Sequence, residues 1–146
     1  MVKLMFSRSK HPGSYLIRAL TWSDYSHVEV LLKDSHIVGS NYPKGVEFFP
    51  LDRRVKEASA YLICEVDVDE NKVRDFLTLQ VGKPYDKTAI FGILMHRDWH
   101  EDDSWFCSEL VCAALQYAGV DLVKKPQNRI TPQDVLQSPL VLRGPF

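Results

Sequence analysis

The segment between residues 26 and 49 constrains the fold most, because it holds three short strand-like stretches separated by turn-forming residues. The stretches cover residues 26–32, 36–42 and 46–49, and the turns between them are Lys33-Asp34-Ser35 and Pro43-Lys44-Gly45. In the first stretch Val28, Val30 and Leu32 recur at every second position and face one side. Because consecutive strands usually pair with their neighbours, this pattern predicts an antiparallel meander.

The rest of the chain adds two strands and several helices. We expect strands at residues 3–7 and 61–68, and helices at residues 14–20, 70–81, 87–95 and 104–118. Ser104 is a suitable N-cap for the helix at 104–118, Gly119 is a suitable end, and Thr131-Pro132 opens a short final helix. A small antiparallel sheet packed against helices is an α+β fold, and 146 residues predict a single domain over residues 1–146.

The charge balance argues against nucleic acid as a partner. The chain has 18 basic and 19 acidic residues, a formal net charge of −1, whereas nucleic-acid binding favours a basic excess. No apolar run approaches the roughly 18 residues of a membrane span, and the apolar part of the N-terminus is too short for a signal-peptide core. We therefore expect a cytoplasmic protein with no transmembrane segment.

Cys107 is the most informative of the three cysteines, which form neither a disulfide framework nor a four-ligand zinc pattern. It lies in the first turn of the predicted helix at 104–118, where unpaired backbone N–H groups and the helix dipole favour an anion. The anionic thiolate is the nucleophilic form of cysteine. Helical spacing puts Cys107 on one stripe with Leu110 and Val111, which we expect to face the sheet. Cys64 and Cys112 are assigned to the core.

A nucleophilic thiol needs a base, and His27 is the best placed of the five histidines. It lies on a predicted strand, which holds a side chain in a defined position. Alternation puts it on the face opposite Val28, with Glu29 two residues further on. Taken alone, this pattern favours an ordinary half-exposed histidine on a sheet. The hypothesis of a catalytic pair requires the Cys107 and His27 side chains to approach within about 3–4 Å.

Two blocks of the sequence resemble the circularly permuted branch of the NlpC/P60 papain-like cysteine hydrolases, the YiiX/YaeF-like proteins. They are Tyr25-Ser26-His27-Val28 and Trp105-Phe106-Cys107-Ser108-Glu109-Leu110-Val111. The histidine block comes first, as in the permuted branch, and weaker matches at 45–51, 82–86 and 130–132 extend the likeness over about residues 22–137. The resemblance implies a papain-like fold, Cys107 as nucleophile and His27 as base, with no cofactor.

The third residue of such a site, which orients the imidazole, departs from the family pattern. The resembled proteins often have a glutamate on the strand after the histidine strand, and Ser40 aligns near that position. A two-residue turn at Asp34-Ser35 pairs Glu29 with Ser40 and puts both on the face of the histidine. We therefore predict Ser40 as the orienting residue. Asn41 after a one-residue slip, Glu29 itself, or an impaired site are the alternatives.

Two further features bear on the site. Tyr85 lines the cleft and binds substrate if the resemblance holds, and otherwise packs at a junction between a loop and a helix. Residues 96–103 hold two histidines four apart together with carboxylates, a pattern compatible with a divalent ion. This segment lacks the His-Glu-x-x-His motif, however, and is typical of a solvated acidic loop, so we expect no metal site. A third possibility is that the loop overhangs the cleft and contacts substrate, given its position just before Cys107.

The sequence therefore predicts a thiol hydrolase that cleaves an amide bond through an acyl-enzyme at Cys107. The substrate by resemblance is a peptide or amino-acid conjugate, such as a cell-wall peptide. A lipid acyl hydrolase or acyltransferase using the same two residues is the second hypothesis, and an exposed apolar rim around the cleft would favour it. A catalytically impaired binding or structural module is the third, and the missing glutamate favours it.

Overall fold

A six-stranded antiparallel sheet forms the centre of the computed structural model, which describes residues 1–88 and 104–144. The strand order is β4-β3-β2-β1-β5-β6. The strands are β1 (Val2–Arg8), β2 (His27–Leu31), β3 (His36–Asn41), β4 (Gly45–Pro50), β5 (Ala60–Val66) and β6 (Leu142–Arg143). The predicted meander is confirmed as β2, β3 and β4, each paired with its neighbour.

Six helical elements are described around this sheet. They are α1 (Pro12–Thr21), α2 (Leu51–Glu57), α3 (Glu70–Gln80), α5 (Cys107–Tyr117), the 3-10 turn η1 (Gln127–Arg129) and α6 (Pro132–Leu136). Thr131 caps α6 as predicted, because its hydroxyl accepts a hydrogen bond from the Asp134 amide. Most of the helix predicted at 87–95 and the whole loop at 96–103 lie outside the described residues. None of the described helices is long and apolar enough to cross a membrane.

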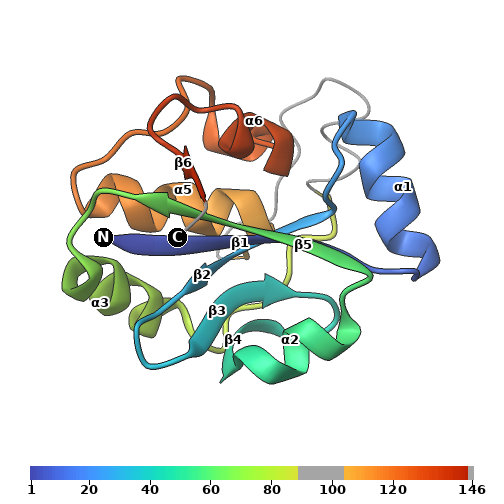
Figure 1. Ribbon diagram of the computed structural model, residues 1–146, viewed down its shortest axis with the longest axis horizontal. Coiled ribbons are helices and arrows are strands. Elements are labelled where there is room, and N and C mark those ends of the chain that lie inside the picture. Colours follow the sequence, from blue (N-terminus) through green and yellow to red (C-terminus); the bar gives the residue numbers. More distant parts are fainter. Residues whose placement is uncertain (89–103, 145–146) are drawn as a thin grey trace.

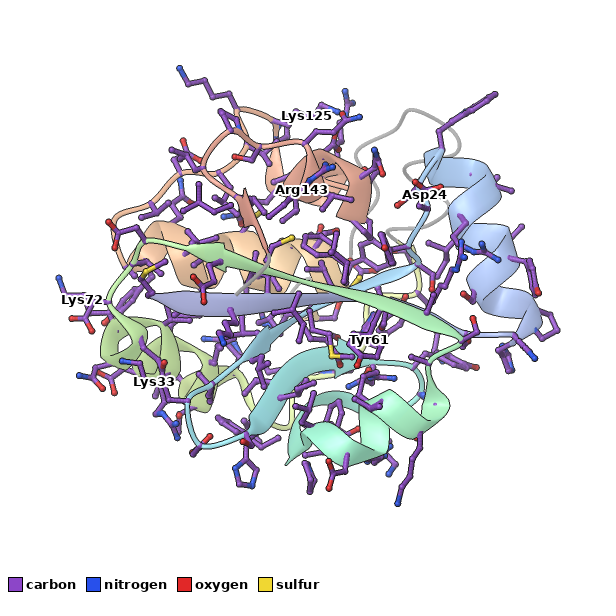
Figure 2. All side chains as sticks on the ribbon, viewed as in Figure 1. Asp24, Lys33, Tyr61, Lys72, Lys125 and Arg143 are labelled. Carbon is purple, nitrogen blue, oxygen red and sulfur yellow. The ribbon has the colours of Figure 1, made fainter. Side chains whose placement is uncertain are left out.

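The two faces of the sheet pack against different helices. Leu4, Phe6 and Val30 on one face share the main core with Leu110 and Val111 of α5. The other face contributes a smaller cluster, made of Met5, Leu31, Ile37 and Phe49 and extended by Leu51 at the start of α2. Figure 1 shows α2 beside β3 and β4. Figure 2 shows the packed side chains between sheet and helices, with charged residues such as Lys72 and Lys125 pointing outward.

The predicted N-cap of the long C-terminal helix is wrong, because α5 begins at Cys107 and its N-cap is Phe106. Residues before it are extended and bridge to Tyr85: the Trp105 amide donates to the Pro84 carbonyl (3.0 Å), and the Asp86 amide donates to the Trp105 carbonyl (3.0 Å). These backbone bonds favour strand geometry at Trp105 over an earlier helical turn. Cys107 is therefore the first helical residue.

The turn between β2 and β3 also differs from the prediction. Leu32 and His36 close a three-residue loop, in which Ser35 has a left-handed backbone (φ 63°). A three-residue hairpin ending on such a residue is a common type, whereas a two-residue turn needs positive φ at its first central residue, Asp34. The longer loop shifts the pairing by one, to Val30–Val38 and Leu31–Ile37. In this register Gly39, and not Ser40, lies opposite Glu29.

Candidate active site

Cys107 is fully buried at the start of α5, and the segment that precedes it is held from two sides. The Glu109 carboxylate, one turn into the helix, accepts a hydrogen bond from the Phe106 amide at 3.1 Å. The Trp105 carbonyl accepts one from the Ser40 hydroxyl at 2.5 Å. Since a helix start leaves its first N–H groups without intrahelical partners, the sulfur of Cys107 sits beside unused backbone donors.

His27, the first residue of β2, contacts both Cys107 and Glu29. Among the described residues β2 and β3 pair only at Val30–Val38 and Leu31–Ile37. The end of β2 that holds His27 is therefore not paired with β3, and there the imidazole contacts the Cys107 thiol. Its Nε2 lies 3.0 Å from Oε1 of Glu29. Burial opposes a charged ring, but the Glu29 carboxylate and Cys107 outweigh it and raise the pKa of His27 to about 9.

Glu29 is a fully buried carboxylate held by a guanidinium. Arg54 of α2 donates from Nε to Oε2 and from Nη2 to Oε1 of Glu29, both at 2.7 Å, which is the bidentate geometry of a strong ion pair. Burial works against ionisation of Glu29, but His27 and Arg54 outweigh it and lower its pKa to about 2. The Glu29 side chain is therefore an anion at neutral pH and faces the imidazole on one side and the guanidinium on the other.

Gly39 makes the space that Glu29 occupies. A Cβ atom at position 39 would lie 2.6 Å from Cγ and 2.8 Å from Oε1 of Glu29, closer than real Cβ contacts allow. A glycine within a strand often marks a place where another group approaches the backbone closely. Gly39 therefore belongs to the construction of the site, although it carries no side chain.

The prediction that Ser40 faces His27 is wrong, because the shifted register turns Ser40 to the opposite side of β3. There its buried hydroxyl donates to the Trp105 carbonyl. The two alternatives in the sequence, Asn41 and Glu29, both lie on the face of the histidine. Glu29 contacts the ring, and the Asn41 amide oxygen accepts from Arg54 at 2.5 Å. Arg54 lies on a helix that the sequence did not predict.

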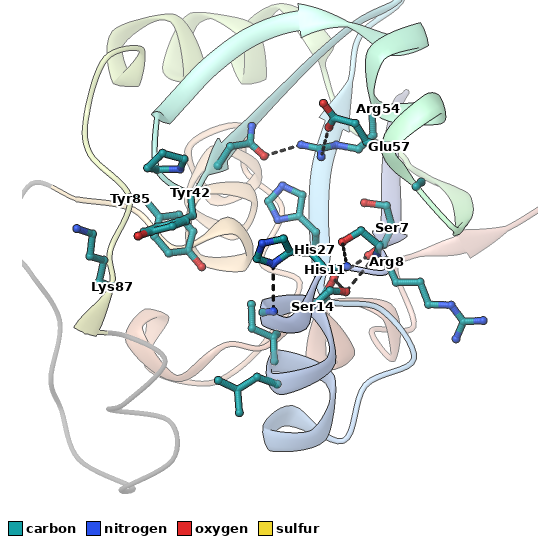
Figure 3. A pocket seen from close by; sticks show the side chains of 18 residues that line it. Ser7, Arg8, His11, Ser14, His27, Tyr42, Arg54, Glu57, Tyr85 and Lys87 are labelled. Carbon is teal, nitrogen blue, oxygen red and sulfur yellow. Dashed lines mark hydrogen bonds and ion pairs between the residues drawn. The ribbon is translucent and has the colours of Figure 1, made fainter.

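A cavity of about 620 Å³ opens beside His27. His27, Asn41 and Tyr85 line it, together with residues of α1 and the Tyr42–Pro43 turn. Figure 3 shows Tyr42, Tyr85 and Lys87 on one side of this cavity and Ser14 of α1 on another. Tyr85 packs edge-on against Tyr42, with ring centroids 5.8 Å apart. Burial raises the pKa of Tyr85, helped by the negative charge of Cys107, so its hydroxyl stays protonated near the sulfur.

The remaining ionisable groups near the helix have other roles. Cys64 and Cys112 are buried as predicted, and burial raises the pKa of Cys112 to about 12. Glu109 is buried. Burial raises its pKa to about 7, and the nearby Asp86 adds to this rise, whereas the hydrogen bond from the Phe106 amide lowers the pKa. Within residues 1–88 and 104–144, no group of three or more metal-binding side chains is assembled. The histidines at 96 and 100 lie outside those ranges.

Comparisons with known proteins show the fold and the family of the chain. A solved structure described as metalloprotein yiiX from Escherichia coli O157:H7 matches with a TM-score of 0.75 and 21% sequence identity, over 97% of this chain and 94% of that one. At this identity the likeness shows the fold, and the metal in its description belongs to that protein. No curated protein matches the chain. The family model for the permuted papain-like amidase enzymes, YaeF/YiiX, matches residues 3–141. Because that match spans nearly the whole sequence, the chain belongs to the C92 family of permuted papain-like amidases.

Proposed function

We propose that the protein cleaves an amide bond by covalent catalysis, with Cys107 as nucleophile, His27 as general base and acid, and Glu29 as the residue that orients His27. The observation that carries the proposal is the unbroken series of contacts from Cys107 through His27 to Glu29. A nucleophile in contact with a base, itself held by a third group, is the arrangement that thiol hydrolases use. Membership of an amidase family supports the same reaction.

The raised pKa of His27 indicates how the reaction starts. With a pKa of about 9 the ring is protonated at neutral pH, and a protonated ring beside the sulfur supports a thiolate. The thiolate attacks the amide carbon, and the carbonyl oxygen becomes an oxyanion that the free N–H groups at the start of α5, including that of Cys107, can bind. The C–N bond then breaks, His27 gives its proton to the leaving amine, and a thioester remains on Cys107.

The second half of the reaction restores the enzyme. Water attacks the thioester carbon while His27 accepts one of its protons. The C–S bond breaks, the carboxylic acid product leaves, and the ring and the sulfur return to their charged pair. Throughout, Glu29 fixes the orientation of the ring and stabilises its positive charge, and Arg54 fixes Glu29. Tyr85 stands in the cavity wall near the sulfur, where we propose that it contacts the substrate.

Alkylation with iodoacetamide, followed by intact-mass measurement, tests the nucleophile without knowledge of the substrate. We expect one fast addition near neutral pH, at Cys107. Cys107→Ala should abolish the fast addition, and Cys112→Ala is the matched control that should retain it, since burial raises the pKa of the Cys112 thiol to about 12 and keeps it protonated near neutral pH. Fast alkylation that persists in Cys107→Ala would overturn the assignment.

A second candidate is the same chemistry on an amide or ester with a long apolar acyl group. The observation in its favour is the rim of the cavity, where Leu16 is 55% exposed and Tyr42 is 66% exposed. Hydrolysis of short peptide amides compared with acyl amides of increasing chain length separates the two candidates. Turnover that rises with acyl length supports the second. The hypothesis of a catalytically impaired binding module rested on the absence of a carboxylate at Ser40. Because Glu29 offers a carboxylate to His27, this reason no longer applies.

A further inference from the structure

Helix α1 carries large apolar side chains that the core does not use. Tyr15 and Leu16 are each 55% exposed, and Trp22, the residue that ends the helix, is 91% exposed. With the exposed Pro12 and Ala19 they recur at helical spacing and form one apolar stripe, called the α1 stripe below. In the described part of the chain, neither hydrophobic core cluster includes a residue of α1. Figure 1 shows α1 beyond the end of the sheet.

The opposite side of α1 holds the helix in place, which fixes the outward direction of the stripe. The Ser14 hydroxyl is buried, lies 2.7 Å from the Ser26 hydroxyl and accepts a hydrogen bond from the Ser9 amide at 3.2 Å. These contacts come from the residue that leads into β2 and from the residue that follows β1. The α1 stripe therefore faces away from the side by which the helix is attached.

The α1 stripe also lies in the most basic part of the chain. Residues 1–23 contain four basic residues and no acidic one, and three of the four, Arg8, Lys10 and Arg18, lie in α1 or just before it; Asp24 follows directly. The Arg18 guanidinium stacks 4.6 Å from the centre of the Tyr15 ring. An exposed helix face of Trp, Tyr and Leu with flanking cations has the composition of helices that lie in the headgroup region of anionic bilayers.

The mouth of the cavity adjoins this surface. Leu16 and Ile17 of α1 line the cavity. Because Leu16 belongs to the α1 stripe, the stripe borders one side of the cavity entrance. Tyr42, 66% exposed, also lines the cavity, and the Lys87 amino group lies 5.6 Å from its ring centre. Figure 3 shows Tyr42 and Lys87 across the cavity from Ser14 of α1. Both sides of the mouth thus combine exposed apolar surface with a cation.

We propose that the α1 stripe docks the protein on an anionic lipid bilayer, with the mouth of the cavity at the lipid interface. Trp22 and Tyr15 enter the headgroup region, and Arg8, Lys10 and Arg18 face the lipid phosphates. The docking itself does not depend on the reaction. On the basis of the proposed function, the amide cleaved at Cys107 belongs to an amphiphile presented by the bilayer.

Co-sedimentation with sized vesicles tests the proposal on the full chain. We expect binding to vesicles of phosphatidylcholine with a quarter phosphatidylglycerol, weaker binding in high salt, and weak binding to pure phosphatidylcholine. The double variant Tyr15→Ser/Trp22→Ser should lower the partition coefficient at least tenfold. Lys10→Gln should lower it about fivefold, since one cation near an anionic surface contributes about that factor.

The matched control is Leu79→Ser/Tyr117→Ser, which removes two apolar residues of similar exposure, 72% and 60%, from α3 and α5. It should bind as the wild type does. Equal losses in the two double variants, or equal binding to neutral and anionic vesicles, would overturn the proposal. A wild-type protein that is dimeric, does not bind vesicles and becomes monomeric in Tyr15→Ser/Trp22→Ser would also overturn the proposal. In that case a second copy of the chain would cover the α1 stripe.

Cys107→Ala separates this proposal from the proposed function. The variant should bind vesicles as the wild type does while losing fast alkylation. Selective alkylation of Cys107 in a protein that does not bind vesicles refutes the docking alone. Vesicle binding with no selective alkylation refutes the nucleophile alone.

Discussion

Replacing Glu29 by Gln tests the centre of the proposed site, because it removes one charge while keeping the size of the side chain. In the wild type the buried carboxylate faces both His27 and Arg54. The rise of the His27 pKa from 6.5 to about 9 corresponds to about 3 kcal/mol in favour of the charged ring, after the opposing cost of burial has been subtracted. Removing one partner of a buried ion pair typically costs about 3–5 kcal/mol. We therefore expect Glu29→Gln to lower the free energy of unfolding by about 3 kcal/mol.

The pH dependence of this loss has a definite sign. The folded pKa of His27 is raised, so its contribution is complete below pH 6.5 and is lost as pH rises through about 9. The folded pKa of Glu29 is lowered, so its contribution is complete above pH 4.5 and is lost as pH falls through about 2. The stability difference between wild type and variant should be largest between pH 4.5 and 6.5. The difference should become smaller toward pH 9, where His27 loses its charge. The contribution of the ion pair between Glu29 and Arg54 should remain.

Urea unfolding of the wild type, Glu29→Gln and Glu57→Gln at pH 6 and pH 9 measures this directly. Glu57 is the matched control, because its Oε2 also accepts from Arg54, at 3.1 Å, but its side chain is 46% exposed. Exposed pairs contribute about 0–1 kcal/mol, so Glu57→Gln should cost little at either pH. Equal losses in the two variants, or a Glu29→Gln penalty that is the same at pH 6 and pH 9, would refute the reasoning.

The same variant should react more slowly with iodoacetamide. At pH 7 a ring with a pKa of about 9 is about 99% protonated. Without the carboxylate, Cys107 alone offsets the effect of burial, so the pKa of His27 falls and a smaller fraction of the rings is protonated at pH 7. The alkylation rate of Cys107 at pH 7 should fall with it. An unchanged rate and pH profile would show that Glu29 does not act on the pair.

Three further variants extend the test to residues around Glu29. Gly39→Ala should cost about 1–3 kcal/mol in urea unfolding and slow alkylation, because its Cβ would displace Glu29. Ser40→Ala should cost about 1 kcal/mol, through the lost bond to the Trp105 carbonyl, and should leave the pH profile of alkylation unchanged; a shifted profile would restore Ser40 as the orienting residue. Arg54→Lys keeps the charge but cannot hold both oxygens of Glu29, so its stability should fall by about 2 kcal/mol and the His27 titration, followed by NMR, should shift.

The elements with repeating apolar patterns could be predicted from the sequence. All five longer strands and helices α1, α3, α5 and α6 were expected near their observed positions, because each has apolar residues at strand or helical spacing or an end marked by a capping residue. Helix α5 was expected three residues too early. Its first residues bond to the segment around Tyr85, which is distant in sequence and gives no local signal.

Helix α2 was missed for the opposite reason. No residue of Leu51–Glu57 is buried, so the segment has no apolar periodicity to detect. Its available signals were Pro50 before the helix and the charge pair Arg53–Glu57 at helical spacing. Because α2 was missed, Arg54 was not considered as a partner for Glu29.

Which residue lies beside His27 depends on whether the turn between β2 and β3 has two residues or three. A two-residue turn at Asp34-Ser35 would need the glycine or asparagine that such turns use at positive φ, and the segment has neither. A three-residue loop needs one left-handed residue, which Ser35 provides, and it moves every residue of β3 by one position relative to β2. Gly39 was an independent signal for the same register, because a strand glycine opposite a glutamate leaves room for a buried carboxylate. Both signals favour Glu29, so in the proposed site the histidine strand itself supplies the carboxylate that the alignment at Ser40 lacked.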